Sequence, residues 1–229
     1  MTIRTFPNIS RLSRYGARLI ASRLEEFAGY GGPVVLALVG GRSVSGIYTA
    51  LSGRDMPAWK QTHFFWADER RVAPDDPLSN YRLAYETLLY PLLERGQISA
   101  ENIHPVDTST DPTDAAWRYT LELKAFGGRF DIALLSAGED NHVAGIFPDR
   151  SYPEDSSFIA FNDSPKPPSE RFTATPLLLS GTRCGIIVFS GAGKRPALDH
   201  FLNGATDKSP AEKVLESIGD LTLLTDQRG

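Results

Sequence analysis

Several continuous apolar runs constrain the fold of this chain more than any other feature of its sequence. The strongest runs are residues 34–39, 130–136 and 185–190, and each is followed within two residues by glycine. A strand that is apolar at every position is typical of a parallel sheet whose two faces are both covered by helices. Residues 63–67 and 221–225 are predicted as further strands, and residues 102–106 and 158–161 as shorter ones.

Segments with helical spacing of apolar residues lie between these runs. The first, residues 10–28, is expected to be capped by Asn8 or Ser10 and to end at glycines. Further helices are predicted at 43–51, 79–92, 112–126, 194–202 and 210–217. Trp117, Leu121 and Phe126 are the expected packing residues of the helix at 112–126. The alternation of strands and helices predicts an α/β fold with a mostly parallel sheet flanked by helices.

Length and composition set the class of protein. A chain of 229 residues with 41% hydrophobic residues suits one large α/β domain or two small ones. We expect residues 1–229 to form a single domain. The formal net charge of −4, without a dense basic face, disfavours a nucleic-acid-binding surface.

The sequence also predicts where the protein is located. No stretch approaches the roughly 20 apolar residues that cross a bilayer, and the N-terminal residues lack the apolar core of a signal peptide. The single cysteine, Cys184, excludes an internal disulfide, and its apolar surroundings predict a buried, inert thiol. We therefore expect a cytoplasmic protein without membrane association.

Polar residues collect where the apolar runs end. In an open parallel sheet, ligands bind beyond the carboxyl ends of the strands. If the sheet is parallel, the four polar clusters therefore meet at one rim. These clusters are Gly40-Gly41-Arg42-Ser43, Asp68-Glu69-Arg70, Gly138-Glu139-Asp140-Asn141-His142 and Gly191-Ala192-Gly193-Lys194.

Two of the clusters have features of an anion site. Gly41 allows close approach of a ligand, Arg42 and Ser43 add donors, and the following helix presents N–H groups. Lys194 is a second candidate for contact with phosphate. A plain structural turn remains an equally open alternative for both clusters. The cluster with Lys194 is not a Walker A loop or a dinucleotide fingerprint, since Arg195 and Pro196 follow the lysine.

His142 is the candidate acid–base residue. A histidine in a polar loop at a strand end can act as a general base near neutral pH, and Asp140 could orient it. A capping or surface role is the alternative. The chain has no HExxH motif or paired-cysteine spacing, so no metal site is predicted. Ser45 occupies the position where a nucleophile elbow would need glycine.

In this order, the clusters resemble the 6-phosphogluconolactonase family over nearly the whole chain. The most specific match is a strand ending in Trp-x-Asp-Glu-Arg, followed by Ser-Asn-Tyr. The matching segments are GGRS at 40–43, WADER at 66–70, SNY at 79–81, GEDNHVAGIFP at 138–148, KPPSERFT at 166–173 and GAGK at 191–194.

The resemblance implies a modified Rossmann-like fold, related to glucosamine-6-phosphate deaminases and ribose-5-phosphate isomerases. It implies hydrolysis of 6-phospho-D-glucono-1,5-lactone in the oxidative pentose phosphate pathway, without metal or cofactor. The only partner it implies is the sugar phosphate substrate, bound by a monomer or homodimer. His142 would activate water with Asp140, Arg70 and Asp68 as further catalytic residues. The residues implied for phosphate binding are Gly41, Arg42, Ser43, Arg171 and Lys194.

The chain departs from the family pattern beside the proposed base. Asn141 and Ser136 stand where the pattern has glycine, and Gly145 stands where it has serine. Because asparagine tolerates positive φ better than most residues, we expect the turn before His142 to be kept. The departures leave His142 and Asp140 in place.

Two other functions stay open. An amino-sugar phosphate deaminase or isomerase would use the same scaffold, but that pattern has Asp-Glu-Tyr at 68–70 and an Asn-Glu-Pro ending at 146–148. A sugar-phosphate-binding protein without catalytic activity is the other alternative, and it rests on the departures at Ser136, Asn141 and Gly145.

Overall fold

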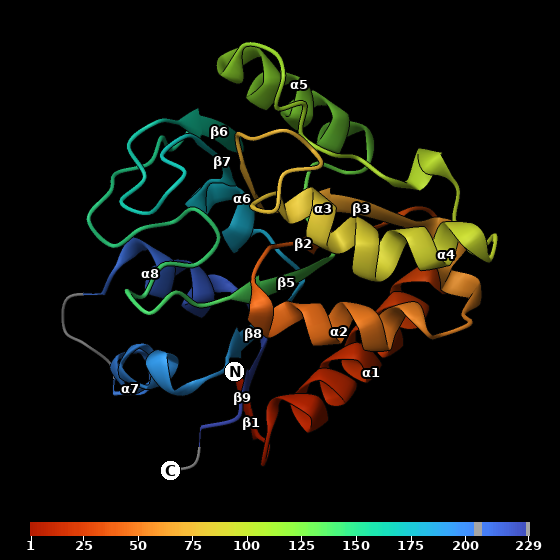
Figure 1. The fold of residues 1–229 in the computed structure, drawn as a ribbon, viewed down its shortest axis with the longest axis horizontal. Helices are drawn as coiled ribbons and strands as arrows, with labels where there is room; N and C mark the ends of the chain where they lie inside the picture. The colour runs from red at the N-terminus through yellow and green to blue at the C-terminus, as the bar shows by residue number, and fades with distance from the viewer. Residues whose placement is uncertain (204–207, 228–229) are drawn as a thin grey trace.

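Over residues 1–203 and 208–227, which the computed structural model describes, the chain forms a six-stranded parallel sheet and a three-stranded antiparallel sheet (Figure 1). In spatial order, the parallel sheet consists of β1 (Thr2–Thr5), β9 (Asp220–Thr225), β8 (Cys184–Phe189), β5 (Ile132–Ser136), β2 (Val34–Leu38) and β3 (Thr62–Trp66). The small sheet consists of β4 (Asp68–Arg70), β7 (Arg171–Ala174) and β6 (Phe158–Phe161).

Helices cover both faces of the parallel sheet. α1 and α2 lie on one side, and α7 and α8 lie on the other (Figure 1). The α-helices are α1 (Ile9–Ala28), α2 (Arg42–Ser52), α3 (Asn80–Ala84), α4 (Tyr90–Glu94), α5 (Pro112–Ala125), α6 (Pro176–Ser180), α7 (Arg195–Leu202) and α8 (Pro210–Ser217). A π-helical turn, Tyr85–Leu89, joins α3 to α4, and short 3₁₀ turns span Pro57–Gln61, Ala100–Asn102 and Ala192–Lys194. The sequence prediction of a mostly parallel, helix-flanked α/β fold is confirmed.

Local details agree with the sequence in part. Asn8, rather than Ser10, caps α1, because its side-chain oxygen accepts a hydrogen bond from the Arg11 N–H at 3.0 Å. The predicted strand at 102–106 is wrong. Only Ile103 forms a bridge, with Phe64, and Pro105 has no N–H with which to extend a ladder.

The packing face of α5 also differs from the prediction. Trp117 is 60% exposed and Leu121 is 43% exposed, whereas Phe126 packs at the edge of the core. The helix contacts the core through smaller residues on a different face, since its packing partner is the small sheet that the sequence pattern did not reveal. The buried residues of α5 are Ala115, Ala116, Tyr119 and Leu123.

The strand order creates a switch point between β2 and β5. From β2 the chain proceeds to β3 on one side, whereas from β5 it proceeds through β8 to β9 on the other. β2 and β5 are nevertheless neighbours, paired in parallel through Leu36 with Ile132 and Ala37 with Ala133. Helices on opposite faces leave a crevice above such a point, which is where open α/β sheets bind ligands.

Ala67 joins the two sheets. Its N–H donates to the Leu38 carbonyl at 2.8 Å, which extends the β2–β3 ladder, and its carbonyl accepts from the Ala174 N–H at 2.7 Å, beside the β4–β7 pair. The chain therefore leaves the parallel sheet at β3 and enters the antiparallel sheet at β4. This crossing places Asp68 and Arg70 above the rim rather than in a loop.

Two buried tyrosines satisfy the backbone at the rim. The Tyr48 hydroxyl on α2 accepts from the Val39 N–H at 3.0 Å and donates to the Val39 carbonyl at 2.6 Å. The Tyr119 hydroxyl on α5 bonds the backbone N–H and the carbonyl of Trp66 in the same way. Each tyrosine thus holds the end of a strand from which site residues continue.

We expect Tyr48→Phe to lower the free energy of unfolding by about 1–3 kcal/mol, because both polar groups of Val39 would be left buried without a partner. Urea unfolding followed by circular dichroism measures this change. Tyr90→Phe is the matched control, since Tyr90 is 48% exposed. A loss for Tyr48→Phe no larger than that of the control would contradict this role of the hydroxyl.

Candidate active site

A cavity of about 250 Å³ opens above the switch point. All four polar clusters identified in the sequence contribute to its walls. Of the predicted site residues, those that line it are Gly41, Asp68, Arg70, His142, Arg171 and Lys194. Two predicted residues lie one step behind the wall: Ser43 contacts Ser136, and Asp140 contacts His142. Arg42 is exposed at the start of α2, outside the cavity lining.

The structure adds lining residues that the sequence analysis did not select. Ser136 lies at the end of β5, Phe147 lies between β5 and β6, and Lys166 and Pro167 belong to the segment between β6 and β7. Lys166 and Pro167 belong to the segment KPPSERFT at 166–173, which matches the family pattern. That match was the feature of the sequence that could have identified them as site residues. Ser136 was recorded only as a departure from the family pattern.

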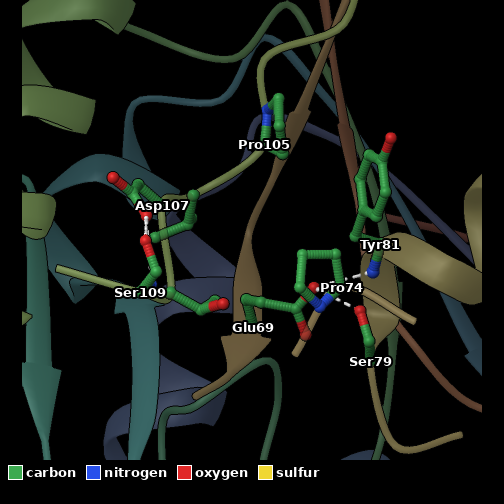
Figure 2. A pocket seen from close by; sticks show the side chains of 9 residues that line it. Glu69, Pro74, Ser79, Tyr81, Pro105, Asp107 and Ser109 are labelled. Atoms are coloured by element: carbon green, nitrogen blue, oxygen red, sulfur yellow. Dashed lines mark hydrogen bonds between the residues drawn. The ribbon is translucent and has the colours of Figure 1, made fainter. Parts of the chain in front are cut away.

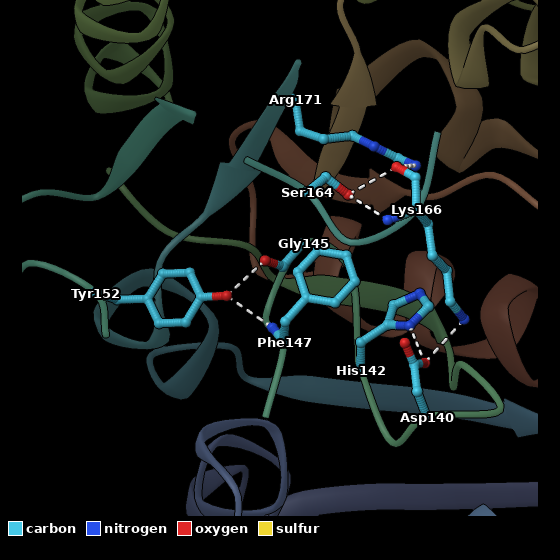
Figure 3. A network of polar contacts seen from close by, with 8 residues as sticks. All are labelled: Asp140, His142, Gly145, Phe147, Tyr152, Ser164, Lys166 and Arg171. Atoms are coloured by element: carbon cyan, nitrogen blue, oxygen red, sulfur yellow. Dashed lines mark hydrogen bonds and ion pairs between the residues drawn. The ribbon is translucent and has the colours of Figure 1, made fainter. Parts of the chain in front are cut away.

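His142 is held by a carboxylate that is itself paired with a cation. The Nδ1 atom of His142 hydrogen-bonds the Asp140 carboxylate, and the Lys166 ammonium lies 3.0 Å from the same carboxylate oxygen (Figure 3). Burial alone would raise the pKa of Asp140, but the hydrogen bonds and charges of His142 and Lys166 outweigh burial and hold this pKa well below its ordinary value. Asp140 is therefore an anion, and Nε2 is the histidine nitrogen left to exchange a proton with a ligand.

The turn that carries this pair depends on Gly138. A Cβ atom on Gly138 would lie 2.0 Å from Nδ1 of His142 and 2.4 Å from Oδ1 of Asp140. The Gly138 N–H also donates to the His142 carbonyl at 2.7 Å, which closes the turn. Asn141 has φ of 66° at its tip, so the expectation that asparagine preserves the turn is confirmed.

Two hydroxyls anchor the segment after His142. Thr173 Oγ1 on β7 accepts from the Gly145 N–H at 3.0 Å. The Tyr152 hydroxyl accepts from the Phe147 N–H and donates to the Gly145 carbonyl, both at 2.7 Å (Figure 3). The Phe147 ring then lies 4.8 Å from the His142 ring, between centroids. These bonds limit how far the imidazole can turn.

Gly145 is required by this packing. A Cβ at Gly145 would lie 2.6 Å from Cβ of Thr173, so a serine at this position would need Thr173 to move.

Positive charge gathers on the wall of the cavity that the small sheet forms. Arg70 and Arg171 are cross-strand partners on β4 and β7. The Arg171 guanidinium donates to the carbonyls of Pro168 at 2.9 Å, Pro167 at 3.0 Å and Lys166 at 3.2 Å. Burial, followed by the charge of Arg70, lowers the pKa of Arg171. Two like charges facing each other across a pair of strands are destabilising, and a bound anion relieves that repulsion.

Lys194 is a further cation of the cavity. It is partly buried, and burial lowers the pKa of its ammonium group. The negative charge of Glu139 acts in the opposite direction and raises this pKa. Asp68 lies nearby in the cavity, 7% exposed, and within the described ranges its Oδ1 atom has no hydrogen-bond partner. The cavity thus combines several cations, one buried acceptor and a histidine–aspartate pair.

Glu69 points to the other side of β4. Its carboxylate accepts from the N–H groups of Arg70 at 2.6 Å, Tyr81 at 2.7 Å and Asn80 at 2.8 Å. Burial raises the pKa of Glu69 to about 7 in spite of these donors. Glu69 therefore links β4 to α3 beside a separate, mainly apolar pocket of about 330 Å³ (Figure 2).

Within residues 1–203 and 208–227, His, Cys, Asp and Glu nowhere form a group of three or more that could hold a metal ion. In the same part of the chain, every helix is too short or too polar to cross a membrane.

Known proteins resemble this chain over almost its full length. The 6-phosphogluconolactonase of Nostoc sp. is 32% identical over 236 residues, which cover 98% of this chain and 95% of that protein. The crystal structure of 6-phosphogluconolactonase from Thermotoga maritima is 27% identical, with a TM-score of 0.85 and 98% of each chain covered. A monomeric glucosamine-6-phosphate deaminase, 19% identical with a TM-score of 0.83, shares the fold over 99% of this chain and 98% of its own.

A family model described as glucosamine-6-phosphate isomerases and 6-phosphogluconolactonases matches residues 7–223. This match covers the small sheet, the parallel sheet except β1 and the last two residues of β9, and all the residues that line the cavity. The chain therefore belongs to the family of glucosamine-6-phosphate isomerases and 6-phosphogluconolactonases.

Proposed function

We propose that this protein hydrolyses 6-phospho-D-glucono-1,5-lactone to 6-phospho-D-gluconate. The observation that carries the proposal is the His142–Asp140 pair at the edge of a cavity lined with arginine and lysine. A phosphorylated lactone needs cations for its phosphate and a proton-transfer group for its ester. The similarity to proteins named 6-phosphogluconolactonase supports this substrate.

In this proposal, the phosphate binds where α2 begins, near Gly41, Arg42 and Ser43, with Lys194 and Arg171 as cationic partners. The N-terminus of α2 favours an anion because its first N–H groups have no partners within the helix. This position leaves the lactone ring facing His142.

The reaction uses His142 as general base and then as general acid. His142 accepts a proton from water through Nε2 while the water oxygen attacks the lactone carbonyl carbon. Arg70 or nearby backbone N–H groups stabilise the oxyanion of the tetrahedral intermediate. The bond from that carbon to the ring oxygen then breaks, and His142 returns the proton to the ring oxygen. Asp140 orients the imidazole and stabilises its cation, and Asp68 positions the arginines.

The deaminase alternative is less consistent with the site. Its sequence pattern carries a carboxylate at the position of Phe147, whereas Phe147 here is 5% exposed and packs against His142. Position 70 holds an arginine in place of the tyrosine of that pattern. An assay of lactone hydrolysis distinguishes the hydrolase from a binding protein without activity.

We further propose a cytoplasmic location and a monomeric or homodimeric assembly, with the sugar phosphate as the only partner. Cys184 supports a reducing compartment, since the thiol is free and buried, and burial raises its pKa to about 12.

Replacing the proposed base tests the mechanism. We expect His142→Ala to lower kcat by about 10²–10⁴-fold, which is the usual contribution of general acid–base catalysis. The measurement is the hydrolysis of freshly prepared phospholactone above its spontaneous rate. His200→Ala is the control, because His200 is exposed on α7 outside the cavity. Full activity in His142→Ala would exclude this histidine as the base.

The turn glycine offers a second test. We expect Gly138→Ala to lower kcat by about 10²-fold, because the added Cβ occupies the space of the His142–Asp140 pair and displaces the imidazole. Gly53→Ala is the matched control, since its Cβ would meet no atom closer than 4.0 Å. Wild-type kcat in a folded Gly138→Ala protein would show that this geometry is unimportant.

Tyr152 is expected to act at a distance from the substrate. Tyr152→Phe removes both hydrogen bonds that hold Gly145 and Phe147, so we expect kcat to fall about tenfold while KM changes little. Steady-state kinetics on Tyr152→Phe and on the exposed-site control Tyr90→Phe separate the two constants. An increase in KM at unchanged kcat would argue against a role in orienting His142.

A further inference from the structure

Ser136 occupies a central place on the rim. It is the last residue of β5, and it pairs in register with Val188 of β8. β5 lies between β2 and β8 in the sheet. Ser43 follows β2 in the first turn of α2, and Lys194 follows β8 in a 3₁₀ turn. A side chain at the end of β5 therefore stands between the two turns that were predicted to bind phosphate.

Ser136 also separates Ser43 from the cavity. The two Oγ atoms are 2.7 Å apart, and Ser136 lines the cavity whereas Ser43 does not. Two hydroxyls that share one hydrogen bond use only one of their two protons. If Ser43 donates to Ser136, the Ser136 proton is available to an anion in the cavity.

The surroundings of Ser136 favour an anionic ligand. Gly41, the N-cap of α2, contributes no side-chain hydrogen bond to the helix, so the first turn of this 11-residue helix is not capped by its own residue. The Lys194 ammonium lines the same cavity, and it interacts electrostatically with Arg42 and Lys166. The opposing carboxylates near Lys194 are Glu139 and Asp140, and Asp140 is already paired with Lys166 and hydrogen-bonded to His142.

We infer that the Ser136 hydroxyl binds the phosphate of the substrate and that Ser43 positions this hydroxyl. The inference rests on the proposed function for the identity of the sugar phosphate. It assigns a binding role to a residue that the family pattern replaces by glycine, which has no hydroxyl. The departure at Ser136 then tightens phosphate binding rather than weakening the site.

Calorimetry with 6-phosphogluconate and with gluconate tests the assignment on the full chain. We expect Ser136→Ala and Ser136→Gly each to weaken 6-phosphogluconate binding about tenfold, the usual effect of losing one hydrogen bond to a charged group. Gluconate, which lacks phosphate, should bind both variants as it binds the wild type. Ser45→Ala is the control, because its hydroxyl donates to the Arg42 carbonyl outside the cavity.

The positioning role of Ser43 has a separate readout. We expect Ser43→Ala to weaken 6-phosphogluconate binding, and the double variant Ser43→Ala/Ser136→Ala to bind no more weakly than Ser136→Ala. Effects that simply add would show that each hydroxyl contacts the phosphate independently, and this would overturn the assignment of Ser43 as a positioning residue.

Kinetics distinguish the phosphate from the lactone carbonyl as the partner of Ser136. We expect Ser136→Ala to raise KM for the phospholactone about tenfold at unchanged kcat. A fall in kcat, or an equal loss of gluconate binding, would place the hydroxyl at the reacting end and overturn the inference.

Failure of the proposed function is recognisable separately. If the wild type binds 6-phosphogluconate without hydrolysing the lactone, the hydrolase proposal fails and the binding comparison still decides the role of Ser136. If the wild type binds neither 6-phosphogluconate nor inorganic phosphate, the inference about Ser136 fails as well.

Discussion

The peptide groups of Ala67 hold together the two parts of the structure on which the site depends. The N–H of Ala67 extends the parallel ladder by donating to the Leu38 carbonyl. The carbonyl of Ala67 accepts a hydrogen bond from the Ala174 N–H, next to the small sheet. Through this residue the strand pair β4–β7 lies above the carboxyl ends of β2 and β5. The arginines of the small sheet therefore face the histidine turn of the large one, although 61 residues of sequence separate β4 from β5.

The electrostatic balance of the cavity follows from that arrangement. Arg70 and Arg171 are placed side by side by strand register, and three loop carbonyls hold Arg171 in position. On the other wall, Lys166 and His142 share the Asp140 carboxylate. Cations thus outnumber anions in a small, partly enclosed volume, which is where charge interactions are strongest. Such a cavity is suited to an anionic ligand that also offers a group for proton transfer.

Rigidity around His142 comes from backbone contacts more than from charge. Gly138 lets the turn close on the imidazole, and Tyr152 and Thr173 fix the backbone of Gly145 and Phe147. Tyr48 does the same for Val39 at the end of β2. Each contact satisfies backbone groups that would otherwise be buried without a partner, so site geometry and stability depend on the same hydrogen bonds.

The sequence predicted the helix-flanked sheet and the approach of the polar clusters, but not the partners within the site. Strands 34–39, 130–136 and 185–190 were recognisable because residues buried on both faces must be apolar throughout. β4 and β7 were not recognisable, since their residues DER and RFTA carry charges that are explained only by the cavity beside them. Trp117 and Leu121 were misassigned for the related reason that the partner of α5 was unknown.

By itself, the sequence determined that four polar clusters end on one rim, because parallel strands all present their carboxyl ends in the same direction. Only the tertiary structure decided which members of each cluster face the cavity. The register of β4 on β7 turns Asp68 and Arg70 toward it and Glu69 away, since successive side chains of a strand point to opposite faces. The path of the long segment before β7 brings in Lys166, and the order of β2, β5 and β8 puts Ser136 in front of Ser43, because distances between strands depend on topology and not on spacing along the chain.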